Sequence, residues 1–96
     1  MLFRSEGQHL VVDLSLKLTE AIHGGKHEIE TLEGKVRISV PAGTKTGDIL
    51  RVRGKGVPGA GFMGSGDLLV VAKVQIPKKL SKKAKEAVKV LEEEGL

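Results

Sequence analysis

The chain contains no cysteine, tryptophan or tyrosine, and phenylalanine occurs only twice among its 96 residues. Without cysteine there can be no disulfide, thiolate zinc site or cysteine nucleophile, so burial of apolar side chains has to hold the fold together. Proteins that bind single-stranded nucleic acids usually stack bases on aromatic rings, and here only Phe3 and Phe62 could do so. No run of about 18 apolar residues could span a membrane, and no secretory leader pattern is present. We expect one soluble, cytoplasmic domain.

The charged residues give little support to nucleic-acid binding, metal binding or catalysis. Sixteen Lys and Arg against twelve Asp and Glu give a net charge of +4, with the two signs mixed along the chain. His23 and His27 have the spacing of two ligands on one helical face, but two glycines between them break such a helix. No third ligand is evident, and no carboxylate pair or Ser/His/Asp spacing stands out. We therefore expect neither an enzyme nor a cofactor.

Alternation of apolar and polar side chains predicts five strands. The clearest covers residues 10–18, where every second residue is leucine or valine. Two runs at residues 27–32 and 35–40 flank a glutamate-glycine turn and predict a hairpin. A short strand follows at residues 48–53, and residues 68–76 are apolar on both faces in their first half, as in a central strand. This pattern predicts a mainly β fold, a small two-layer antiparallel β-sandwich.

Two helices accompany the strands. Residues 19–23 end at a glycine pair and are long enough only for a short corner helix. Ser81 can cap a C-terminal helix whose apolar residues recur at three- and four-residue spacing and form one stripe. The stripe consists of Leu80, Ala84, Ala87, Val88 and Leu91. A helix of about 14 residues is marginal alone in water, so this stripe must pack on its own sheet or on a second copy.

The charges of the C-terminal helix run against its macrodipole. Its lysines gather near the N-terminus and its glutamates near the C-terminus, whereas the macrodipole favours the opposite arrangement. This weakens the isolated helix and favours a docked one.

Six of the fourteen residues from 54 to 67 are glycine, and they include a G-x-G-x-x-G pattern from Gly59 to Gly64. A dinucleotide site needs a helix directly after this pattern, so that the helix N-terminus meets the pyrophosphate. Here a predicted strand follows instead. We therefore interpret the stretch as a connection between strands.

The strand at residues 10–18 and the run at residues 27–32 could also form a binding site. If their apolar side chains were incompletely covered, a shallow groove beside a free strand edge could accept an extended peptide. The alternative is that these leucines belong to the core.

Seven short motifs follow one another along the chain: FRSEGQHL, LTEAIHG, TLEG, VPAGTKTG, LRVRGKGVP, GDL and IPKKLS. In this order they resemble the second C-terminal substrate-binding domain of the DnaJ heat-shock co-chaperones, and they cover nearly the whole chain. The resemblance implies a β-rich client-binding domain over residues 1–79 and a helical dimerisation segment over residues 80–96. It also implies a role in the stress response, in which unfolded clients are delivered to a DnaK-type ATPase chaperone.

The resemblance further implies that the sequence is a fragment of a longer protein. The J domain with its His-Pro-Asp signature, the Gly/Phe linker, the zinc-binding module and the first C-terminal domain are absent from it. Contact with the DnaK-type chaperone would therefore use parts outside this sequence.

The resemblance implies two sets of site residues. The candidate client contacts are Leu14, Leu16, Ile29 and Phe62, although Phe62 could instead fold back onto the core. The candidate dimer contacts are the stripe residues Leu80, Ala84, Ala87, Val88 and Leu91.

Two other interpretations of the sequence remain open. The domain could be a basic β-barrel that binds RNA or ribosomes through Arg51, Arg53 and Lys55. It could also be a spacer that only sets the geometry of a dimer.

Overall fold

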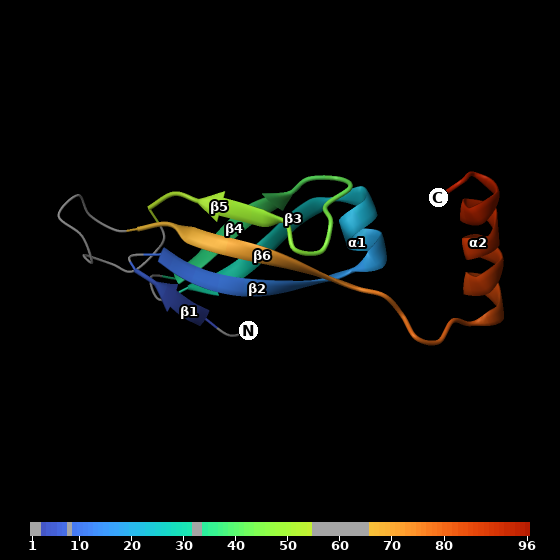
Figure 1. Ribbon diagram of the computed structural model, residues 1–96, viewed down its shortest axis with the longest axis horizontal. Helices are drawn as coiled ribbons and strands as arrows, with labels where there is room; N and C mark the ends of the chain where they lie inside the picture. The colour runs from blue at the N-terminus through green and yellow to red at the C-terminus, as the bar shows by residue number, and fades with distance from the viewer. Residues whose placement is uncertain (1–2, 8, 32–33, 55–65) are drawn as a thin grey trace.

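The computed structural model describes residues 3–7, 9–31, 34–54 and 66–96. Over these residues the chain forms two β-sheets, a short helix at one end of them, and a C-terminal helix that stands apart (Figure 1). All five predicted strands and both predicted helices are present. The structure confirms the expected β-rich fold with a corner helix and a C-terminal helix.

The larger sheet has four strands in the order β1-β2-β6-β5. These strands are β1 (Phe3–Glu6), β2 (His9–Lys17), β6 (Leu68–Gln75) and β5 (Ile49–Val52). The two central strands, β2 and β6, are the longest in the chain, which agrees with the apolar character of β6 on both faces.

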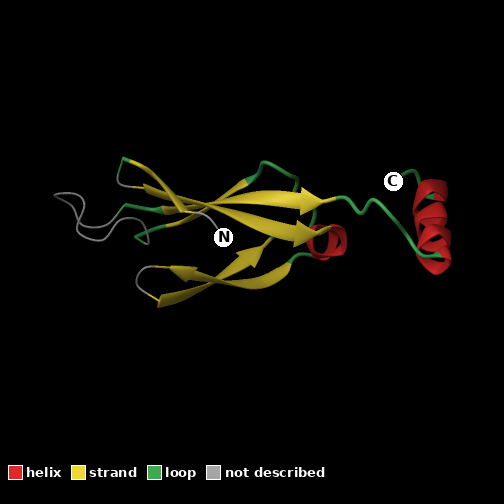
Figure 2. Cartoon of the chain, turned by 90° about the horizontal axis from the view of Figure 1, so that it is seen from below, coloured by secondary structure: helices red, strands yellow, loops and turns green. Residues whose placement is uncertain are grey.

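The smaller sheet is a hairpin of β3 (Gly25–Thr31) and β4 (Gly34–Val40), paired antiparallel from Gly25↔Val40 to Thr31↔Gly34. It lies against one face of the larger sheet, so the two sheets form two layers (Figure 2). The helix α1 (Leu18–His23) leads from β2 into this second layer.

The prediction that the sandwich is antiparallel throughout is wrong at its centre, because β2 and β6 are parallel. Their register runs from Leu10↔Leu68 to Lys17↔Gln75. A parallel pair needs a long crossover connection, and here the chain between the two strands passes through the second layer and the edge strand β5 before it returns. The alternation of side chains shows which face each residue occupies but carries no information on strand direction.

The edge strand β1 was not predicted from the sequence. It pairs antiparallel with β2, from Phe3↔Val12 to Glu6↔His9. Three of its four residues are polar, so no apolar alternation marks it. Its extended form depends on the backbone hydrogen bonds that β2 offers.

The core lies between the two layers. Its largest fully buried side chains come from both sheets: Leu16, Ile29, Leu68, Val12 and Val70. Alternate residues of β2 and β6 face the hairpin, whose Ile29, Ile38 and Val40 are also buried. Each such side chain contributes about 1.5–3 kcal/mol when it leaves water.

The expected groove between residues 10–18 and 27–32 is absent from this structure. Leu16 and Ile29 have no exposed surface, and Leu14 is 6% exposed. The strands β2 and β3 lie in different sheets and face each other across the core, so they share no edge that a peptide could join. Three of the candidate client contacts, Leu14, Leu16 and Ile29, are therefore core residues here.

The junction between α1 and the hairpin is held by close backbone packing. Gly24 ends α1 with a φ of 72°, and its N–H donates to the carbonyl oxygen of Glu20 at 2.8 Å. A Cβ atom at this position would lie 2.6 Å from both the Ala42 nitrogen and the Val40 oxygen. Only glycine fits here, because both its backbone conformation and the space around it exclude a side chain.

We predict that Gly24→Ala destabilises the domain more than Gly43→Ala does. Gly43 has a similar φ of 78°, but a Cβ there would meet nothing within 4 Å. The substitution at Gly43 should cost about 1 kcal/mol from backbone strain alone, and the clash at Gly24 should add about 2 kcal/mol. Urea unfolding of the two variants measures the difference, and equal losses would show that the junction can relax.

Candidate binding grooves

Two apolar grooves lie at the end of the sheets that carries α1. The first, which we term the corner groove, has a volume of about 360 Å³. It lies between α1, the loop that follows β4, and the end of β6. Its lining residues are Leu18, Ala21, Ile22, Gly43, Thr44, Lys45, Thr46, Val74 and Ile76.

Hydrogen bonds hold the loop wall of the corner groove in place. The Thr44 hydroxyl donates to the carbonyl oxygen of Pro41 at 2.6 Å, and the Thr44 N–H donates to the Ala21 oxygen at 3.2 Å. The Thr46 hydroxyl accepts the Val74 N–H at 3.1 Å. Because these polar groups of Thr44 and Thr46 are hydrogen-bonded to the backbone, the surface that faces the groove is mostly apolar.

Two isoleucines at the rim of the corner groove are unusually exposed. Ile22 on α1 is 48% exposed, and Ile76, which follows β6, is 71% exposed. Both remain in water unless another molecule covers them. This exposed apolar surface gives the groove the character of a binding site.

The second groove, which we term the helix groove, has a volume of about 440 Å³ and separates the sheets from α2 (Lys82–Glu93). Its sheet-side wall is formed by Lys17, Leu18, Thr19, Ile22, Gln75 and Pro77. Its helix-side wall contains all five residues of the predicted stripe: Leu80, Ala84, Ala87, Val88 and Leu91.

The helix α2 begins as the sequence predicts, with the Ser81 hydroxyl accepting the Ala84 N–H at 3.1 Å. It stands at one end of the molecule, apart from the sheets, in both views (Figures 1 and 2). No residue of α2 is buried, and Val88 and Leu91 remain 42% and 38% exposed. The stripe therefore points toward its own sheets across an open groove without packing on them.

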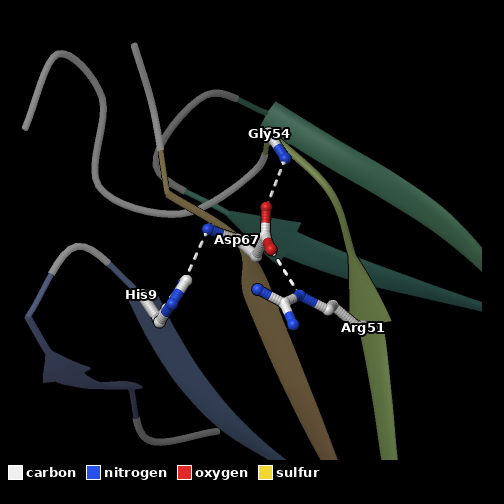
Figure 3. Close-up of polar contacts among 4 residues, drawn as sticks. All are labelled: His9, Arg51, Gly54 and Asp67. Atoms are coloured by element: carbon white, nitrogen blue, oxygen red, sulfur yellow. Dashed lines mark hydrogen bonds and ion pairs between the residues drawn. The ribbon is translucent and has the colours of Figure 1, made fainter. Parts of the chain in front are cut away.

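At the opposite end of the sheets, Asp67 joins three strands through the contacts in Figure 3. Its carboxylate accepts hydrogen bonds from the Arg51 side chain on β5 and from the Gly54 N–H, the latter at 3.0 Å. Its backbone N–H donates to Nδ1 of His9 at 2.9 Å, and its carbonyl oxygen accepts the Leu10 N–H at 3.0 Å. Asp67 thus ties the start of β6 to both neighbouring strands, a role that sequence reasoning missed.

The environment of Asp67 favours its charged form. The hydrogen bond from the Gly54 N–H, followed by that from Arg51, holds the pKa of the Asp67 carboxyl below its ordinary value of 3.8. Since the folded-state pKa is depressed, this contribution to stability is complete above about pH 3.8 and is lost as the pH falls toward the lower, folded-state value.

We predict that Asp67→Asn lowers the free energy of unfolding of the domain at neutral pH. The difference in this free energy between the variant and the native chain should narrow below about pH 4. Urea unfolding of both chains from neutral pH to about pH 2.5 measures this difference. The control is Glu28→Gln, which removes an exposed ion pair with Lys35 at 3.5 Å and should change stability little. A difference that stays constant over the whole range would mean that the charge of Asp67 is unimportant.

The remaining candidate residues are those of the glycine-rich stretch and of the β-barrel alternative. Phe62, Lys55 and the G-x-G-x-x-G pattern lie outside the described residues. Arg51 is paired with Asp67, and the larger sheet is open, with β1 and β5 at its edges. The described strands therefore do not form the β-barrel of the alternative interpretation, and Arg53, its other described residue, is exposed.

The histidines and the helices give no further site. Nε2 of His27 lies 3.8 Å from the Glu20 carboxylate, which links β3 to α1. Across residues 3–7, 9–31, 34–54 and 66–96, no three His, Asp or Glu side chains form a group that could hold a metal ion. Over the same residues no helix is long and apolar enough to cross a membrane.

The fold is that of a small β-sandwich domain with a helical tail. The family model of the DnaJ C terminal domain matches residues 1–77. The chain belongs to this family.

Curated relatives named Chaperone protein DnaJ support the same assignment. The protein from Caldicellulosiruptor saccharolyticus is 45% identical over 91 residues, which are 95% of this chain and 24% of the relative. The protein from Bacteroides fragilis is 46% identical over 92 residues, 96% of this chain and 23% of the relative. The protein from Nitrosomonas europaea is 42% identical over 90 residues, which are 94% of this chain and 24% of the relative. The chain spans about a quarter of the length of these relatives.

Proposed function

We propose that this domain serves a DnaJ-type co-chaperone by binding exposed apolar segments of unfolded polypeptides and by joining two copies of the protein. Residues 1–79 hold the client, and residues 80–96 form the dimer contact. Membership of the DnaJ C-terminal domain family supports this assignment. Delivery of the client to a DnaK-type ATPase chaperone rests on other parts of a full-length DnaJ protein.

The observation that carries the client-binding proposal is the exposure of Ile22 and Ile76 at the rim of the corner groove. Leu14, Leu16 and Ile29 are buried, so we place the proposed client contact at the α1 end of the sandwich and not at its middle. Full burial of an isoleucine side chain contributes about 1.5–3 kcal/mol to the free energy of binding. The entropy lost on association offsets much of this contribution. The resulting affinity is modest, which suits a protein that must release its clients.

The corner groove also has the right character for a non-native chain. Its surface is apolar, its walls are held by backbone hydrogen bonds, and Lys45 is its one charged lining residue. Contacts of this kind favour apolar side chains in general and not a particular sequence. Many different unfolded segments can therefore occupy it.

We predict that Ile76→Asp weakens binding of a permanently unfolded, reduced and carboxymethylated protein by about tenfold, a loss of about 1.4 kcal/mol. The expected cause is the loss of apolar contact at the rim, because Ile76 lines only the corner groove. A fluorescence titration with the labelled client measures the affinity.

The matched control is Ile49→Asp. Ile49 on β5 is 60% exposed and lies in neither groove, so its substitution should leave the affinity within about twofold. Equal weakening by both variants would indicate a general effect of negative charge. An unchanged affinity of Ile76→Asp for the client would exclude the corner groove as the client site and favour the spacer interpretation.

The dimer proposal is supported by the unpacked stripe of α2. A helix this short gains most of its stability from tertiary packing, yet Val88 and Leu91 remain well exposed in the single chain. A second copy would cover them.

We predict that Leu91→Asp converts a dimer into a monomer while the sheets stay folded. Sedimentation equilibrium measures the mass, and circular dichroism reports the β content. The control is Val90→Asp, because Val90 is 57% exposed but does not line the helix groove. An unchanged mass for Leu91→Asp would exclude the stripe from dimerisation.

A further inference from the structure

The charges of α2 are segregated toward its two ends and form no ion pair with the described residues. Its first turn contains no acidic residue, and its last turn contains no basic residue. The macrodipole disfavours this arrangement at both ends. Within the part of the chain that the structure describes, the ion pairs lie on the sheets and α1, and none involves α2. Pairs such as Lys82 with Glu86 offset part of this cost, and opposite charges on a second molecule would offset more of it.

The charges that flank the stripe are placed symmetrically. With about 3.6 residues per turn, Lys83 and Glu94 border one side of the stripe, and Lys85 and Glu92 border the other. The midpoint of each pair falls at the same place, between Val88 and Lys89. In a second helix that runs antiparallel about this midpoint, Lys83 stands opposite Glu94 and Lys85 stands opposite Glu92, in both directions.

The sizes of the stripe residues fit the same arrangement. Around this midpoint, Leu91 of one copy lies at the height of Ala84 and Ala87 of the other, so the largest apolar side chain of α2 meets the smallest. A parallel pair would instead place leucine on leucine and alanine on alanine, leaving a gap between the helices. It would also align lysines with lysines and glutamates with glutamates.

We infer that α2 pairs with α2 of a second copy in antiparallel orientation, and that the segregation of lysine and glutamate along the helix selects this orientation. The inference rests on the proposed dimerisation and specifies its partner surface and geometry. The stripe lines the helix groove but is not buried there, so it remains available to a partner helix. Exposed ion pairs add little individually, but four of them related by symmetry discriminate between the two orientations.

Mixing of the native chain with a charge-swapped chain tests the orientation. The swapped chain carries Lys83→Glu, Lys85→Glu, Glu92→Lys and Glu94→Lys, which leave the net charge and the stripe unchanged and agree better with the macrodipole. In an antiparallel pair, each chain matches itself and repels the other, so mixed dimers should fall about tenfold below the statistical share at low salt. In a parallel pair, mixed dimers would exceed that share, and this result would overturn the inference. Native mass spectrometry with one chain isotope-labelled counts the dimers.

A high salt concentration provides the internal control. At about 1 M salt the screening length is about 3 Å, and the mixed dimers should return to the statistical share. Self-sorting that persists at high salt would mean that packing, not charge, selects the partner, which would also overturn the role assigned to the lysines and glutamates.

A second pair of variants tests the role of position. Lys83→Glu with Lys85→Glu, beside the stripe, should weaken the native-type dimer about tenfold. Lys82→Glu with Lys89→Glu makes the same change of net charge on the opposite side of the helix, and the dimer affinity should stay within about twofold. Equal effects would point to net charge alone and contradict the inference.

Because the native chain contains no cysteine, cross-linking gives an independent measurement. Lys83→Cys mixed with Glu94→Cys should form a disulfide-linked dimer on mild oxidation, whereas neither variant should do so alone. Cross-linking of Lys83→Cys with Lys85→Cys, and not with Glu94→Cys, would establish the parallel orientation. A native chain that stays monomeric at every concentration would instead refute the proposed dimerisation, so the two failures are distinguishable.

Discussion

The parallel pairing of β2 with β6 is the contact on which the rest of this structure depends. The register from Leu10↔Leu68 to Lys17↔Gln75 makes these two strands the centre of the larger sheet. Because they are parallel, the chain between them has to leave the sheet and return, and the hairpin β3–β4 that forms on the way covers the sheet's inner face. The core and both layers follow from this one pairing.

The two ends of the β2–β6 pair differ in structure. At one end Asp67 ties β6 to both of its neighbours through hydrogen bonds to backbone and side chains. At the other end the strands pass into α1 and the segment that leads to α2, and there Ile22 and Ile76 remain exposed. Both grooves lie at this second end of the pair.

The helix α2 shows how a segment can be suited to a partner and not to its own chain. Its Ser81 cap is satisfied within the chain, but its apolar stripe is unpacked and its end charges oppose the macrodipole. These features weaken an isolated helix. In an antiparallel pair the same charges would face their opposites, so a property that is unfavourable in one copy would become a means of orienting two.

The sequence alone determined where both helices and five of the six described strands lie, which residues form the stripe of α2, and which family the chain resembles. The elements and the stripe follow from the order of residues within short segments, and the resemblance follows from the order of seven motifs along the chain. Only the tertiary structure decided that β2 and β6 are parallel, that β1 is a strand, and that Asp67 connects three strands.

The candidate client site shows the same division most clearly. Alternation placed Leu14, Leu16 and Ile29 on one face of their strands, but it could not show whether that face meets water or another sheet. The hairpin covers them, while Ile22 and Ile76, which look like ordinary apolar residues in the sequence, stay in solvent. The physical reason is that burial depends on neighbours supplied by distant parts of the chain, and periodicity within one segment carries no record of them.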